Sequence, residues 1–131
     1  MEKGRITQVI GPVIDVEFTT GKLPMIRDAL TVEVNGKKRV MEVAQHMGNR
    51  IVRCIMLATS EGLSKNMEVT ATGSCIKVPV GEKTLGRMFN VLGEPIDKKG
   101  DVNAEEKWGI HRKAPSFQEQ SPVVEVLETG I

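Results

Sequence analysis

The stretch that decides the fold is residues 30–44, LTVEVNGKKRVMEVA, in which two alternating segments flank an Asn-Gly pair. In the first segment, 30–34, apolar and polar side chains alternate, which is typical of a strand with one buried face. Asn35-Gly36 supplies the two positive φ angles that a tight type I′ turn requires. Alternation resumes over residues 39–44 on the return. These residues therefore predict a β-hairpin.

The same alternation continues on both sides of this hairpin. Ile14, Val16 and Phe18 predict a further half-buried strand. The run 51–57 is apolar on both faces except at Arg53, which fits either a strand or a short helix. We prefer a strand there because the run is short and rich in β-branched residues.

Two more short strands complete the pattern around a turn at Thr72-Gly73. Their apolar residues are Met67 and Val69 in one, and Ile76, Val78 and Val80 in the other. From Gly4 onward, about six strands fit within residues 1–78. A sheet this short removes its exposed edges most simply by closing on itself. The predicted fold is therefore mainly β, with an N-terminal six-stranded closed antiparallel β-barrel over residues 1–78.

The pattern changes after Pro79, because prolines and glycines interrupt the chain throughout residues 79–131. No independent core is visible there, so we interpret this part as an incomplete piece of a domain that later residues complete. One short helix is predicted, with Thr84 capping its first turn and Gly93 ending it. Its apolar face consists of Leu85, Met88, Phe89 and Leu92. The apolar end at Ile131 is interpreted as a truncation.

Composition disfavours several functional classes. With 40% hydrophobic and 27% charged residues, the sequence has the balance of a globular protein. Its 18 basic and 17 acidic residues leave a net charge of +1, which provides no broad electrostatic footprint for nucleic acid. No apolar stretch approaches the roughly 20 residues of a membrane helix, and no signal or transit peptide is apparent. We expect neither nucleic-acid binding nor direct membrane insertion.

The segment Gly81-Glu82-Lys83-Thr84 resembles the end of a phosphate-binding loop but fails its spacing. That motif needs adjacent Gly and Lys followed by Ser or Thr, so that successive backbone amides face the phosphates. Glu82 separates the glycine from the lysine here. We interpret the segment as a turn that leads into the predicted helix.

Cysteine and histidine side chains also receive structural interpretations. Cys54 and Cys75 are far apart and form no C-x-x-C pair, so we predict buried thiols in a reducing compartment rather than zinc ligands. A Cys–His nucleophile using His46 or His111 has no supporting local signature.

Charged residues of the second half fit no known site pattern. His111-Arg112-Lys113 is interpreted as a solvated basic corner rather than an anion site. Asp97, Asp101, Glu105 and Glu106 lack the alternation of a calcium loop and are expected to face water. The residues by themselves therefore predict no catalytic, cofactor-binding or metal-binding side chain.

Several blocks of the sequence resemble the beta subunits of F-type ATP synthases. They are GRITQVIGPVIDV at 4–16, EVAQHMG at 42–48, IVR at 51–53, EGL at 61–63, VPVGEKTLGRMFNVLGEPID at 78–97, IHRKAPSF at 110–117 and ETGI at 128–131. The segment 85–87 is shared with alpha subunits, vacuolar-type subunits and flagellar export ATPases. The blocks at 4–16 and 110–117 favour the beta subunit.

The resemblance implies a six-stranded barrel, residues 1–78, followed by the truncated start of an α/β nucleotide-binding domain, residues 79–131. It implies a parent enzyme that uses Mg-ATP and ADP, a proton-transporting ATP synthase in which alpha and beta subunits alternate in a hexamer around a central stalk. In that family the phosphate-binding loop and catalytic residues follow the segment matching 128–131, so none is assigned to this chain: catalytic none, cofactor-binding none, metal none.

These implications define the expected role of the chain. We expect a structural, ring-forming fragment that does not bind Mg-ATP alone and tends to oligomerise through its barrel. Its expected location is the cytoplasmic face of the cell membrane, as a peripheral part of the synthase. The alternatives are a free-standing oligonucleotide-binding barrel, which the neutral charge and scarce aromatic residues disfavour, and a subunit of a vacuolar or flagellar-type ATPase.

Overall fold

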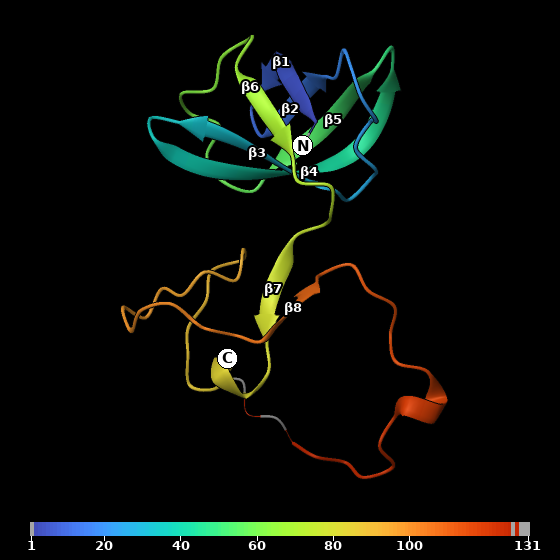
Figure 1. The fold of residues 1–131 in the computed structure, drawn as a ribbon, viewed down its shortest axis with the longest axis vertical. Helices are drawn as coiled ribbons and strands as arrows, with labels where there is room; N and C mark the ends of the chain where they lie inside the picture. Colours follow the sequence, from blue (N-terminus) through green and yellow to red (C-terminus); the bar gives the residue numbers. More distant parts are fainter. Residues whose placement is uncertain (1, 127, 129–131) are drawn as a thin grey trace.

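The computed structural model describes residues 2–126 and 128, which form two different parts (Figure 1). Residues 2–71 form a barrel, and the described residues from 72 onward form a loop-rich tail. The barrel strands are β1 (Lys3–Ile10), β2 (Val13–Glu17), β3 (Ala29–Val34), β4 (Lys37–Gly48), β5 (Ile51–Met56) and β6 (Glu68–Ala71). The tail contains β7 (Lys77–Val80), η1 (Glu82–Thr84), β8 (Glu106–Gly109) and η2 (Phe117–Glu119).

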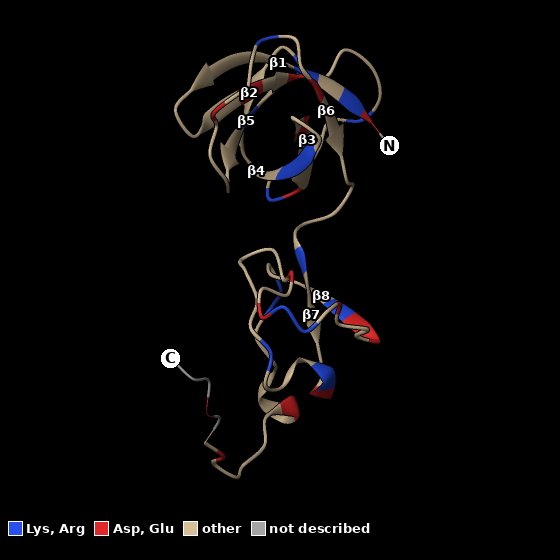
Figure 2. Ribbon diagram, turned by 90° about the vertical axis from the view of Figure 1, so that its left-hand side faces the viewer, with Lys and Arg blue, Asp and Glu red and all other residues tan. Residues whose placement is uncertain are grey.

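The barrel closes in the strand order β1-β2-β5-β4-β3-β6, and β6 pairs back onto β1. All of its pairings are antiparallel. Figure 2 shows the strands encircling the barrel axis, with charged residues of both signs on the barrel and the tail. Closure leaves these strands no unpaired edge. The predicted six-stranded closed antiparallel barrel is confirmed.

The barrel interior is filled by one face of every strand. Its largest fully buried side chains are Phe18, Ile6, Ile14, Leu30 and Met41. Burying an aliphatic or aromatic side chain of this kind contributes about 1.5–3 kcal/mol. In β5 the buried residues are Val52, Cys54 and Met56, which alternate as in a strand. The preference for a strand over a helix in this run is therefore confirmed.

The hairpin between β3 and β4 forms as the sequence predicts. Val34 pairs with Lys37, which leaves Asn35 and Gly36 as the two turn residues. Their φ angles are 51° and 73°, as a type I′ turn requires. This turn fixes the register, so that Met41 faces the interior opposite Leu30.

The strand predicted around Ile76, Val78 and Val80 exists as β7, but it lies outside the barrel. The barrel's six places are taken by β1 to β6, and closure leaves no edge for a seventh strand. The chain turns away at Gly73, whose φ is 76°, and β7 pairs instead with β8. We call this two-stranded sheet the ribbon. β7 spans position 78, where the boundary between the two parts was predicted.

The helix predicted after Thr84 does not form. Only the single turn η1 is helical, and Leu85 already has an extended backbone. The Thr84 hydroxyl donates to the Gly81 carbonyl at 2.6 Å instead of capping amides. A helix this short is marginal by itself, and local polar contacts stabilise a different shape.

A closed loop replaces that helix. The guanidinium of Arg87 donates to both carboxylate oxygens of Asp97, which brings the two ends of residues 87–97 together. Asn90 Oδ1 accepts backbone bonds from Leu92 and Glu94 at 2.9 and 3.0 Å. These bonds stabilise a tight loop whose apolar residues share no helical face.

Candidate functional site

An apolar strip lies on the outer wall of the barrel. Val13 of β2 pairs with Ile10 on one side and with Ile55 of β5 on the other. Leu57 comes just after β5, where its amide donates to the Val40 carbonyl and its side chain is exposed like that of Ile55. Directly opposed residues in neighbouring strands have Cβ atoms about 5 Å apart, so these side chains form one surface. We call Ile10, Val13, Ile55 and Leu57 the outer strip.

The outer strip is open to solvent. Ile10 is 53% exposed, Ile55 47% and Leu57 41%, whereas the inward-facing Ile14, Val52 and Cys54 of β2 and β5 have no exposed surface. Leaving this much aliphatic surface in water is unfavourable, and contiguous patches of this kind mark protein contacts. The geometry therefore makes the strip the best candidate for a contact with another polypeptide.

A charged pair lies beside the outer strip, on strands β2 and β5. Arg53 Nε and Nη2 each donate to an Asp15 carboxylate oxygen at 2.8 Å, in a bidentate arrangement. Asp15 is 7% exposed. The hydrogen bond from Arg53 lowers the pKa of Asp15, and the same bond raises the pKa of Arg53. The pair is therefore ionised near neutral pH and gives the wall a fixed polar rim next to the strip.

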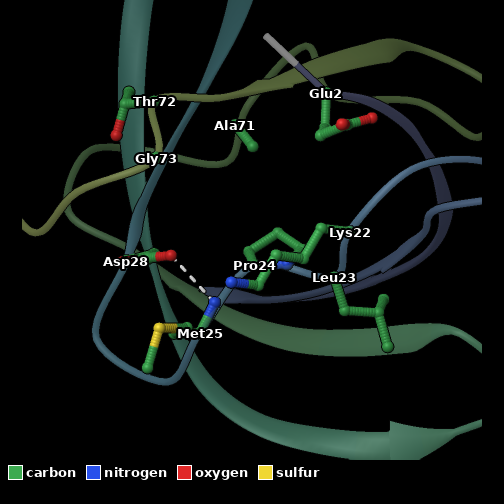
Figure 3. Close-up of a pocket in the computed structure, with 9 residues that line it drawn as sticks. All are labelled: Glu2, Lys22, Leu23, Pro24, Met25, Asp28, Ala71, Thr72 and Gly73. Atoms are coloured by element: carbon green, nitrogen blue, oxygen red, sulfur yellow. Dashed lines mark hydrogen bonds between the residues drawn. The ribbon is translucent and has the colours of Figure 1, made fainter.

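A cavity of about 300 Å³ lies at one end of the barrel, where the β2–β3 connection approaches the end of β6 (Figure 3). Its charged residues are Glu2, Lys22 and Asp28. The Asp28 carboxylate already accepts the Met25 amide at 2.8 Å. One ammonium beside two carboxylates does not concentrate positive charge, so this cavity does not suit a phosphate group.

The segment at Gly81 to Thr84 does not fit a triphosphate. Lys83 Nζ lies 3.1 Å from Glu105 Oε1, and Glu82 lines the same hollow. The helix η1 has only three residues, so it offers no row of free amides at its start. The interpretation of this segment as a turn agrees with the structure, although the helix expected after it is absent.

The cysteines differ from each other. Cys54 is buried in the barrel, and burial raises the pKa of its thiol to about 12. Cys75 is only partly buried, in the connection between barrel and tail, so the prediction of two buried thiols holds for Cys54 alone. The two histidines contact other groups: His46 Nε2 lies 2.7 Å from the Pro24 carbonyl oxygen, and His111 Nε2 lies 2.7 Å from Glu42 Oε2.

His111, Arg112 and Lys113 are exposed, as expected of a solvated basic corner, although His111 contacts Glu42 and the Arg112 guanidinium lies 3.7 Å from the centre of the Trp108 ring. One expectation for the acidic residues is wrong. Asp97 does not face water, since its side chain is 5% exposed. The bond from Arg87 lowers the pKa of Asp97 strongly. Asp101, Glu105 and Glu106 are exposed, as expected.

Residues 2–126 and 128 lack two further features. In this part of the chain no cluster of three or more His, Cys, Asp or Glu side chains is arranged to hold a metal ion. No helix among the same residues has the length and apolar character needed to cross a membrane.

Sequence reasoning did not single out the outer strip. The sequence did contain an indication of an apolar outer surface. The run 51–57 is apolar on both faces, whereas a strand with a solvated outer face would alternate apolar and polar residues. What joins Ile55 to Ile10 is the pairing of β1, β2 and β5, which the sequence does not reveal.

Comparison with known families identifies one match. Residues 6–73 match the beta-barrel domain of the ATP synthase alpha/beta family. The matched region covers 68 of 131 residues, just over half of the chain. It contains most of β1 and all of β2 to β6, and it ends two residues after β6.

Proposed function

Because the chain belongs to the ATP synthase alpha/beta family, we propose that it is the N-terminal, ring-forming portion of an F-type ATP synthase beta subunit. The observation that carries the proposal is the outer strip on a closed barrel. A closed barrel has no free strand edge, so it cannot join a neighbour by extending its sheet. Contacts with neighbours must use side chains on the outer wall, and the strip supplies them.

The choice of the beta subunit rests on the sequence. The block at 4–16 covers β1 and most of β2, so the beta-like residues belong to the same strands that build half of the outer strip. The block at 110–117 follows β8 and includes His111, which contacts the barrel. In this proposal the neighbours are alpha subunits in an alternating hexamer, with a central stalk inside the complete assembly.

The proposed role of the chain is anchoring. All six strands pair on both sides around an apolar core, so the barrel is a stiff point of attachment for parts that move. The parent enzyme would make ATP from ADP and phosphate, driven by proton flow, at the cytoplasmic face of the membrane. Its Mg-ATP chemistry would use other residues, since the Gly81 to Thr84 segment does not fit a triphosphate.

Association with an alpha subunit tests this function. We expect analytical ultracentrifugation to show the chain binding an F-type alpha subunit more tightly than it binds itself. Ile55→Asp should weaken that binding at least about tenfold, because a carboxylate cannot be desolvated in an apolar contact without a partner. Phe117→Asp is the matched control, since Phe117 is 91% exposed in the tail, and it should bind like the unaltered chain.

Two results would contradict the proposal. Unchanged binding by Ile55→Asp would remove the outer strip from the interface. Calorimetry that detects a tight one-to-one Mg-ATP site on the isolated chain would contradict the purely structural role.

A further inference from the structure

The ribbon is attached to the barrel first through the chain itself. After β6, Thr72 donates its amide to the Ala29 carbonyl at 3.1 Å and its hydroxyl to the same oxygen at 2.7 Å. The Ala29 amide in turn donates to the Ser74 carbonyl at 2.9 Å. These bonds bind residues 72–74 to the start of β3. A single attachment of this kind would still allow the ribbon to rotate about the following residues.

The second strand of the ribbon returns to this connection. β7 and β8 pair from Lys77 opposite Gly109, and the Ile110 amide extends the pairing by donating to the Ile76 carbonyl at 3.0 Å. Gly109 lies so close to Cys75 that a Cβ atom placed there would be 2.6 Å from Sγ. The end of β8 is therefore held next to the base of β7, at the side of the ribbon nearest the barrel.

A second attachment joins the ribbon to the barrel wall. His111, two residues after β8, places Nε2 2.7 Å from Oε2 of Glu42 in β4. The two side chains are 30% and 26% exposed, so water reaches this contact only in part. Glu42 lies between Ala29 of β3 and Ile55 of β5 in the barrel register. The contact therefore lies between the first attachment and the outer strip.

The residue after the histidine is also held in place. The guanidinium of Arg112 stacks on the ring of Trp108 in β8, 3.7 Å from its centre. A stacked arginine restricts the backbone on the far side of His111, while the Ile110 bond restricts the near side. The His111 side chain is thus pre-positioned for Glu42, which reduces the entropy lost in forming the contact.

From this geometry we propose that the Glu42–His111 contact is a latch that fixes the orientation of the ribbon on the barrel. Two attachments, one through β7 and one after β8, prevent rotation that either one alone would allow. The barrel and ribbon then act as one rigid body, and movement is confined to the segments beyond it, 81–105 and 112–126. The inference concerns the chain alone and does not depend on the subunit or partner proposed above.

Hydrogen exchange of the full 131-residue chain tests the latch. The Ile110 amide is the reporter, because its bond to Ile76 closes the end of the ribbon. We expect Glu42→Ala and His111→Ala each to speed its exchange about fivefold, the factor for one hydrogen bond of ordinary net strength. The double variant should exchange no faster than either single variant, and Glu42→Gln, which keeps an acceptor oxygen, should restore most of the protection.

Orientation can be measured directly by spin labels at Lys37→Cys in β4 of the barrel and Lys107→Cys in β8 of the ribbon, in a Cys75→Ser background. The distance distribution should at least double in width in both alanine variants. Two substitutions at exposed positions serve as controls: Glu33→Ala in β3 of the barrel and Lys113→Ala, two residues after His111. Both should leave the width of the distance distribution and the Ile110 exchange rate unchanged.

Thermal unfolding of each variant checks that the barrel itself is intact. Unchanged Ile110 exchange and unchanged label distances in the two alanine variants would overturn the latch. Effects of the two substitutions that multiply in the double variant would also overturn it, because they would act through separate contacts.

Discussion

The barrel and the tail both contain many apolar residues but use them differently. In the barrel, every strand pairs on both sides and buries one face, and Phe18 has no exposed surface. In the tail, Phe117 is 91% exposed and Val124 92%. The tail keeps its shape through local polar contacts, such as Arg87 with Asp97 and Asn90 with Glu94. Most of the buried apolar side chains therefore lie where the barrel strands converge on a common interior, and Ile76 at the base of the tail is a buried exception.

The largest difference is expected from the same substitution in each part. Phe18→Ala removes a fully buried ring and should lower the free energy of unfolding by about 3–5 kcal/mol, enough to threaten the fold. Phe117→Ala removes a solvated ring and should change it by less than about 0.5 kcal/mol. Urea unfolding followed by circular dichroism measures both. Equal losses would show that the tail has a core of its own.

Cys54 in the barrel and Cys75 in the tail should differ in the rate at which their thiols react. Raising the thiol pKa from 9.0 to about 12 lowers the thiolate fraction of Cys54 about a thousandfold near neutral pH. An aromatic disulfide reagent should therefore modify Cys75 quickly and Cys54 only when the barrel opens. In Cys75→Ser the remaining reaction should be slow and should accelerate in urea. Rapid labelling of that variant in native buffer would mean that the barrel interior is accessible.

The Asp15–Arg53 pair should make the stability of the barrel depend on pH. Because Arg53 lowers the pKa of folded Asp15, the stabilisation is present above the unfolded pKa of about 4 and is lost as pH falls through the folded value. Asp15→Ala should lower the free energy of unfolding by about 2 kcal/mol at pH 7. Below pH 4 the gap between this variant and the unaltered chain should shrink. Unfolding curves at pH 7, 5 and 3 measure it, and a constant gap would contradict this assignment.

Sequence patterns predicted the barrel better than the tail for a physical reason. Alternation at Leu30, Val32 and Val34 and the turn at Asn35-Gly36 act in the same direction as the final packing. In the tail the spacing of Leu85 and Met88 predicted a helix, but both side chains are exposed, so no packing surface stabilises a helix there. The ion pair between Arg87 and Asp97, ten residues apart, stabilises a loop instead, and hydrophobic periodicity carries no information about that pair.

The candidate site was less predictable than the fold. The sequence showed that residues 51–57 were apolar on both faces, yet the outer strip depends on which strands become neighbours. Likewise, His111 and Glu42 are 69 residues apart, and no local pattern links them. The absence of an assigned catalytic residue stays a prediction.

By itself, the sequence determined the strand positions, the hairpin register and the identity of the family, because these depend on local backbone preferences and on residue order. Only the tertiary structure decided that six strands close without β7, that Ile10, Val13 and Ile55 form one surface, and that the ribbon meets the barrel at Glu42. Those features depend on which distant segments come into contact. The physical reason is closure of the barrel: six strands paired in a ring fix which strands are neighbours and leave no free edge, so β7 pairs with β8 instead.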